Sequence, residues 1–287
     1  MPTHAALACL VMLAGAPALS LAQPPAQPIT IEPDRPDVTN GTHIVDTGLL
    51  QIEVGGQYTR TSSSERSFGT PFTARVGVFD WLEARIGTDG WLLQADEGGR
   101  AAGIGNLQVG AKMRLWADPG GVPVLSILPA VNVPTASVDK GLGSGDADYT
   151  VAFLTGTDIG RHWHADLNYG LGAIGAGGGQ PHFLQQLASV SVSVAATDNW
   201  NPYVEVFYFS KQDPSSGAAT SIDTGGIYEL GARFAVDGGV QFGVSRDAPA
   251  FAAFAGFSMI VGDILGNHGV HERARQEAER AARRPQK

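Results

Sequence analysis

Polar and apolar residues alternate along most of this chain, between residues 48 and 262. In the first alternating segment Leu50 and Ile52 share one face, while Gln51 and Glu53 share the other. A period of two residues predicts β-strands, because successive side chains of a strand point to opposite faces of the sheet. We count about twelve such segments of roughly ten residues each, separated by Gly, Pro, Asp and Asn, which predicts an all-β protein.

The connections between these segments alternate in length. Short connections are expected at Asp80-Trp81, Asp118 to Gly121, Gly160-Arg161, Asp198-Asn199 and Asp237-Gly238. Longer connections, rich in Gly and Ser, are expected at residues 62–67, 141–145, 175–179 and 213–221. Short turns at one end and long loops at the other predict an antiparallel up-and-down transmembrane β-barrel whose short turns face the periplasm.

The tryptophans support the same arrangement. Four of the five lie beside expected short turns, and therefore at one end of the barrel: Trp81, Trp116, Trp163 and Trp200. At a membrane interface an indole ring contacts lipid while its N–H stays hydrated. The pattern predicts an aromatic girdle, and the alternative is a soluble β-sandwich whose tryptophans cover one end.

Charged residues within the segments fall on the face opposite the apolar one. There are five acids and five bases: Glu53, Arg75, Glu83, Arg85, Lys112, Arg114, Asp166, Glu205, Glu229 and Arg233. We expect them to line the lumen as a network of salt bridges and water, because ionised groups away from bulk water need partners. The alternative is the solvated face of a soluble sheet.

Composition favours the membrane interpretation. Charged residues make up only 16% of the 287 residues, and 38 are glycine, whereas soluble domains average roughly 25% charged residues. Mean hydropathy is −0.01, and beyond the first residues no stretch approaches the roughly 18 apolar residues of a membrane-spanning helix. A membrane location therefore requires a barrel. The net charge of −9 argues against nucleic acid as a partner and leaves outer-membrane lipid and a small solute.

The first residues predict export. An apolar run from Ala5 to Leu21, followed by Ala22, is typical of a signal peptide over residues 1–22. We then expect a Pro-rich periplasmic N-terminal segment over residues 23–47, the barrel over residues 48–262 and a polar tail, helical or disordered, over residues 263–287. Residues 24–42 have the length to fold back as a plug, and the sequence leaves this open. The single cysteine, Cys9, lies in the apolar run, so the exported chain has no disulfide or thiol nucleophile.

Catalytic and metal-binding patterns are sparse. His162, His164 and Asp166 alternate as the ligands of a metal site in a strand do, but no fourth ligand is identifiable. A lipid-hydrolysing barrel needs a serine nucleophile with a histidine base, and no histidine stands beside a suitable serine. We therefore expect no catalytic residue, metal or cofactor, and a protein that is not an enzyme.

Several short motifs resemble those of the MetA-pathway of phenol degradation family of outer-membrane proteins. They are Asp34-Arg35-Pro36-Asp37-Val38-Thr39, Gly48 to Glu53, Gly103 to Leu107 with Lys112, Val133-Pro134-Thr135 and Ala255 to Ser258. The chain departs from the family in having Gly105-Asn106 where members often have Gly-Asp, and in its basic tail. The resemblance implies a transporter-like barrel associated with aromatic degradation.

We therefore expect an outer-membrane channel for small, hydrophobic or aromatic molecules. The lumen charges most expected to govern passage are Glu53, Arg85, Lys112, Arg114, Glu229 and Arg233. The alternatives are a structural or adhesion barrel with a filled lumen and an outer-membrane lipid hydrolase.

Overall fold

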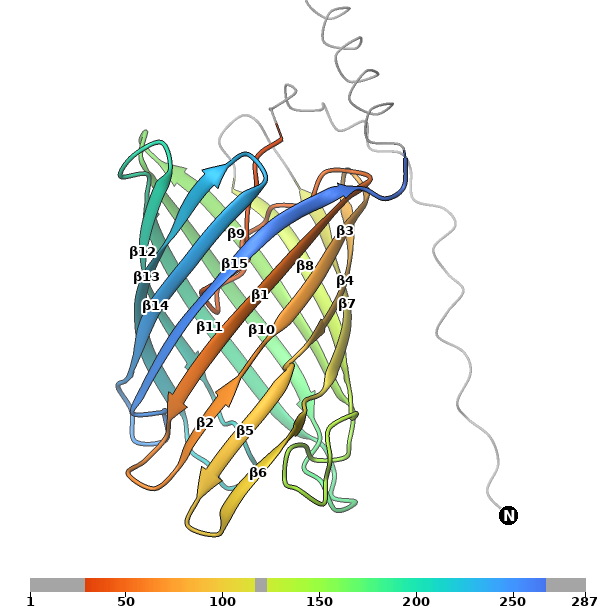
Figure 1. Ribbon diagram of the computed structural model, residues 1–287, viewed down its shortest axis with the longest axis vertical. Helices are drawn as coiled ribbons and strands as arrows, with labels where there is room; N and C mark the ends of the chain where they lie inside the picture. Colours follow the sequence, from red (N-terminus) through yellow and green to blue (C-terminus); the bar gives the residue numbers. More distant parts are fainter. Residues whose placement is uncertain (1–28, 117–122, 267–287) are drawn as a thin grey trace, which may run out of the picture.

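The computed structural model describes residues 29–116 and 123–266. The expected signal peptide, the turn at Asp118 to Gly121 and most of the expected tail lie outside these residues. The described chain forms one antiparallel sheet that closes on itself, because the first strand, β1, pairs with the last, β15 (Figure 1). Twelve strands make up this closed barrel, which confirms the predicted fold class.

Nine of the twelve strands are continuous. They are β1 (Leu49–Arg60), β8 (Val124–Val133), β9 (Asp148–Ile159), β10 (Trp163–Ile174), β11 (Phe183–Val194), β12 (Trp200–Phe209), β13 (Ala219–Gly231), β14 (Phe234–Gly243) and β15 (Phe251–Asp263). Each pairs with its neighbours in sequence order, which is the up-and-down topology that the connection lengths predict.

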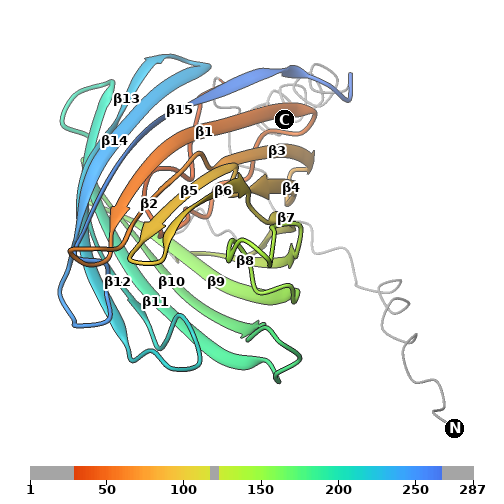
Figure 2. The ribbon, with the colours of Figure 1, turned by 60° about the horizontal axis from the view of Figure 1, so that its bottom comes forward.

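The other three strands are interrupted, each by two residues. They are β2 with β3 (Arg66–Gly69 and Phe72–Phe79), β4 with β5 (Leu82–Thr88 and Trp91–Asp96) and β6 with β7 (Gly99–Ile104 and Leu107–Trp116). Pro71 has no N–H to donate to the ladder, and Gly90 has a positive φ of 69°. The breaks lie side by side, since the Gly105 N–H donates to the Gly90 carbonyl at 2.8 Å. Beyond them β2, β5 and β6 prolong the wall at the long-loop end (Figure 2).

One expected turn is wrong. Asp237-Gly238 lies inside β14, and the connection is formed instead by residues 232–233, between β13 and β14. Asp-Gly is a strong turn signal in sequence. In this barrel the side chain of Asp237 lies in the interior. Gly239 leaves room for the Phe254 ring, because a Cβ at Gly239 would lie 2.6 Å from that ring.

The barrel has an apolar exterior and a charged interior. Leu167, Val204 and Ile222 are exposed on its outside, whereas Arg75 and Lys112 are fully buried inside. This distribution is the reverse of that in a soluble protein and is typical of a barrel surrounded by lipid. No helix among the described residues is long and apolar enough to cross a membrane.

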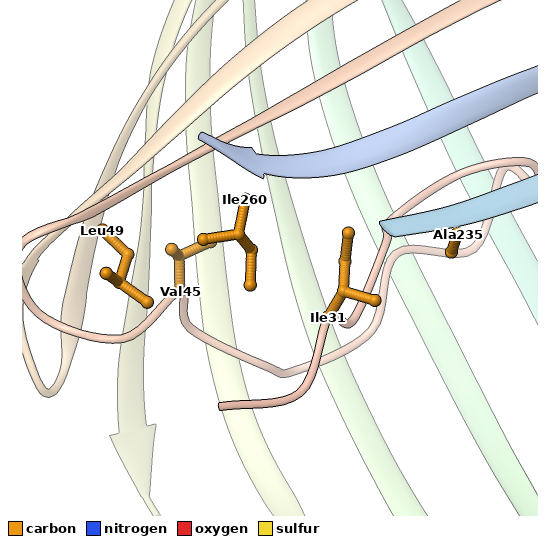
Figure 3. Close-up of a cluster of buried hydrophobic side chains, with 5 residues drawn as sticks. All are labelled: Ile31, Val45, Leu49, Ala235 and Ile260. Carbon is orange, nitrogen blue, oxygen red and sulfur yellow. The ribbon is translucent and has the colours of Figure 1, made fainter. Parts of the chain in front are cut away.

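The segment before β1 lies inside the barrel. Residues 29–46, called the plug below, enter from the short-turn end and lie within the ring of strands (Figure 1, Figure 2). Ile31 and Val45 of the plug are buried in a small apolar cluster with Ile260 of β15, Leu49 of β1 and Ala235 of β14 (Figure 3). The two ends of the plug are therefore fixed at the same place, near the seam between β1 and β15.

Candidate functional site

Arg75 is the centre of a buried charged cluster in the lumen. Its Nη1 donates to Glu53 Oε1 at 2.7 Å, and its Nε donates to Glu83 Oε1 at 2.9 Å. Glu53, Arg75 and Glu83 come from β1, β3 and β4, whose pairing places them side by side. Their side chains are at most 2% exposed, a depth at which a charge is tolerated only with hydrogen-bonded partners.

Asp34 of the plug completes this cluster. Its carboxylate accepts from Lys112 Nζ at 2.6 Å and from Arg85 Nη1 at 2.7 Å. Burial alone would raise the pKa of the Asp34 carboxyl, but Arg75, Lys112 and Arg85 outweigh it and hold the pKa well below its ordinary value. With Asp34 in place the cluster has three acids and three bases and is neutral.

Arg35 forms a second attachment of the plug, on the neighbouring wall formed by β1, β15 and β14. Its Nη2 donates to Asp237 Oδ1 of β14 at 3.0 Å. The guanidinium lies over Gly55 and Gly256, which face each other across the β1–β15 seam. A Cβ on either glycine would come within 2.6 Å of the guanidinium, so this slot exists only because both positions lack a side chain.

The far turn of the plug, around Val38 to Asn40, is held by a third set of contacts. Glu205 of β12 accepts from the backbone N–H groups of Val38 at 2.9 Å and Thr39 at 2.6 Å, and also bonds the Thr39 hydroxyl. The Asn40 N–H donates to Asn168 Oδ1 of β10 at 2.7 Å. The plug is therefore bound to β1, β3, β4, β7, β10, β12 and β14, mainly by hydrogen bonds and ion pairs.

Two cavities flank the plug. The larger, of about 570 Å³, lies toward the short turns, where Arg114, His164 and Glu229 line it. The smaller, of about 360 Å³, lies on the long-loop side and combines apolar side chains such as Leu171 and Phe209 with polar ones. Asp34 lines both cavities, so the plug separates them.

Nine of the ten predicted lumen residues lie in strands and face the interior. Five of these are fully buried, namely Glu53, Arg75, Glu83, Lys112 and Glu205, while Arg85, Arg114, Asp166 and Glu229 line the two cavities. The tenth, Arg233, was expected on the same face but lies exposed in the turn between β13 and β14. The expectation fails because this turn comes earlier in the sequence than Asp237-Gly238 suggested.

The four predicted girdle tryptophans lie at the short-turn end and are exposed: Trp81, Trp116, Trp163 and Trp200. His162 lies in the turn before β10, while His164 bonds Asp158 at 2.7 Å and Asp166 at 3.2 Å. Among the described residues no group of three or more His, Cys, Asp or Glu side chains is arranged to hold a metal ion.

Sequence reasoning missed three contributors to the interior. Asp34 and Arg35 lie in a segment without strand periodicity, and Asp237 was assigned to a turn. The one signal for the first two was the run from Asp34 to Thr39, because charged residues beside prolines, directly before the first strand, match a motif of the family that the sequence resembles.

Comparison with known proteins agrees with this architecture. The family described as "Putative MetA-pathway of phenol degradation" matches residues 33–260, so the match begins inside the plug. No curated protein sequence matches the chain.

Two solved structures share the fold. The COG4313 outer membrane channel from Pseudomonas putida F1 has a TM-score of 0.63 at 12% identity, covering 78% of this chain and 100% of that chain. The NanC porin has a TM-score of 0.53 at 12% identity, covering 72% and 98%. The closed barrel, its apolar exterior and the family match lead to one conclusion: this chain is an outer-membrane β-barrel that belongs to the Putative MetA-pathway of phenol degradation family.

Proposed function

We propose that this barrel is a channel for small, partly apolar molecules, including aromatic ones, and that passage requires the plug to move. The observation that carries the proposal is the position of the plug between two cavities. Its far turn is held by polar contacts to Glu205, Asn168 and Lys112, the last through the Gly41 carbonyl. Hydrogen bonds and ion pairs exchange with water more readily than a packed apolar core separates, because water offers them alternative partners.

The class of solute is inferred from the smaller cavity. Its wall combines Leu128, Leu171, Leu187 and Phe209 with a polar floor supplied by the plug. Binding sites for small organic molecules typically have this composition, an apolar lining with a few polar groups that orient the ligand. An aromatic ring with one polar substituent fits this lining.

The experiment is solute uptake into liposomes that contain the purified protein. Salicin, a neutral phenolic glucoside, is compared with sucrose, which is of similar size and lacks an aromatic ring. We expect salicin to enter faster than sucrose, and the double variant Asp34→Asn with Arg35→Gln to admit both faster. Lys140→Met is the matched control, because Lys140 lies exposed in the loop before β9 and, within the described part of the chain, bonds only the Ala102 carbonyl.

The second candidate is a structural barrel with a filled lumen. The neutral cluster around Arg75 favours it, since every charge in the cluster already has a partner. If neither solute enters with the wild type or with the double variant, although both are folded, the channel proposal fails and this candidate stands.

A further inference from the structure

Charged residues occur at one place only on the outward face of the described strands. Residues directly opposite each other in an antiparallel ladder share a face, so the register extends the outward series around the barrel from exposed positions such as Ile86 and Val109. Within the described strands, the charged members of that series are Arg60 of β1, Arg66 of β2 and Arg100 of β6. All three are basic, which distinguishes this part of the outer surface from the rest.

The three arginines lie in one row at the long-loop end. Arg60 is directly opposite Arg66, Arg66 is directly opposite Ala95 of β5, and Ala95 is directly opposite Arg100. Figure 2 shows β1, β2, β5 and β6 side by side in this order. Neighbouring strands are about 5 Å apart, so the three side chains start from a strip roughly 15 Å wide. The small side chain of Ala95 leaves space between Arg66 and Arg100.

The row has no counterion within the described part of the chain. All three arginines are exposed, and none of them forms an ion pair there. The acids nearest in sequence, Glu65, Asp96 and Glu97, are exposed in or beside the connecting turns, and Asp96 accepts backbone N–H groups of its own turn. Like charges directly opposite each other in a sheet are unfavourable. An anion that bridges Arg60 and Arg66 would remove this repulsion.

The outward face is apolar on the side of the row toward the middle of the barrel. The register places Tyr58 opposite Phe68, and Phe68 opposite Leu93. Trp91, the tryptophan outside the predicted girdle, follows opposite Ile104. All five side chains are exposed. The arginine row therefore lies at the edge of the lipid-facing band, where polar headgroups begin, and with the short turns on the periplasmic side this edge belongs to the outer leaflet.

We propose that this face binds a phosphorylated glycolipid of the outer leaflet, with its phosphate groups on Arg60, Arg66 and Arg100 and its acyl chains along Phe68 and Leu93. A guanidinium binds a phosphate through two parallel hydrogen bonds, which gives arginine an advantage over lysine at such a site. A strip of three arginines matches a headgroup with two phosphates. The adjoining apolar surface matches a lipid and offers nothing to a soluble anion. This inference goes beyond the proposed function, because it concerns the outside of the barrel and holds whether or not the barrel conducts.

The test is native mass spectrometry of the purified full chain released from detergent micelles, with diphosphoryl lipid A as the probe. Monoglucosyl diacylglycerol, which has a sugar and acyl chains but no phosphate, is the comparison lipid. We expect the wild type to bind lipid A at least about tenfold more tightly than the comparison lipid. The triple variant Arg60→Gln with Arg66→Gln and Arg100→Gln should bind lipid A about tenfold more weakly than the wild type, or weaker still.

The matched control replaces three exposed arginines outside the row, Arg161, Arg233 and Arg246, with glutamine. It removes the same charge and should leave lipid A binding unchanged, and heat-modifiable gel mobility shows that both triple variants are folded. Equal losses in the two variants would reduce the effect to net charge and overturn the proposal. Two measurements on the wild type would also overturn it. They are equal affinity for the two lipids, and displacement of lipid A by an equal concentration of inorganic phosphate, which would assign the row to a small soluble anion.

Discussion

Lys112 in β7 and Asp34 in the plug form a buried ion pair of 2.6 Å, although 78 positions separate them in the sequence. The pair joins the barrel wall to the segment that occupies its lumen. Lys112 Nζ also donates to the Gly41 carbonyl at 2.8 Å, so one side chain binds the plug at two points.

Replacing Lys112 should loosen the plug without unfolding the barrel. Lys112→Met keeps the length of the side chain but leaves Asp34 with Arg85 and Arg75 alone. Breaking a buried pair costs roughly 3–5 kcal/mol, and we expect about 2 kcal/mol here because those two arginines remain. The midpoint of heat-modifiable gel mobility should fall, and single-channel conductance should rise. Lys140→Met should change neither, and a conductance equal to wild type would contradict the role given to Lys112.

Gly55 offers a way to move Arg35 alone. In Gly55→Ala the new methyl group would occupy the place of the Arg35 guanidinium. The side chain of Arg35 is flexible at that end, so it should swing away and lose Asp237, at a cost of about 1 kcal/mol. Gly262→Ala is the control, because a Cβ there meets open space. Unfolding of Gly55→Ala is measured with and without Asp237→Asn. If Gly55→Ala acts through the Arg35–Asp237 pair, the two changes in the free energy of unfolding should not add.

The plug should also respond to pH through Asp37. Burial and then the neighbouring Glu205 raise the pKa of Asp37 well above its ordinary value. A raised pKa means that the folded state holds this proton more tightly than the unfolded chain does. The bound proton of Asp37 therefore stabilises the folded state fully below the ordinary carboxyl pKa. This stabilisation is lost as the pH rises to the raised pKa of Asp37. Because asparagine does not titrate, Asp37→Asn should be more stable than wild type over that pH range and equally stable in acid, measured as thermal unfolding midpoints. A constant difference at all pH values would contradict this assignment.

The exterior should tolerate charge only near its ends. Val204 lies exposed within β12, where it faces lipid. Val204→Lys should destabilise the barrel in liposomes by about 2–3 kcal/mol, because a lysine near the bilayer midplane costs roughly that much. Val244→Lys, in the loop after β14, should cost under about 1 kcal/mol. Urea unfolding in lipid vesicles gives both values, and equal costs would place Val204 outside the hydrocarbon layer.

Sequence periodicity predicted most of the strands and most of the charged side chains that they direct into the lumen, but not the plug residues that bind these side chains. Glu53 and Lys112 could be identified because every second residue of a strand shares a face, and the apolar positions between them showed which face is outside. Asp34 could not be paired with Lys112 in advance, because its segment has no period and follows prolines. Asp237 was misplaced because Asp-Gly resembles a turn, although the glycines after it make room for Phe254. Local patterns determine strands, whereas the contents of the lumen depend on contacts between distant positions.

The shared anchorage of Ile31 and Val45 has a mechanical consequence. Because both ends of the plug leave through the same mouth of the barrel, the segment is a hairpin inserted from one side and not a thread that runs through the pore. Tension applied on the N-terminal side of Ile31 would load the contacts one after another, first the apolar anchor, then Asp34 and Arg35, and last the turn held by Glu205. Such peeling needs less force than shearing all contacts at once, so we expect a pull from the short-turn end to extract the plug while the long loops stay in place.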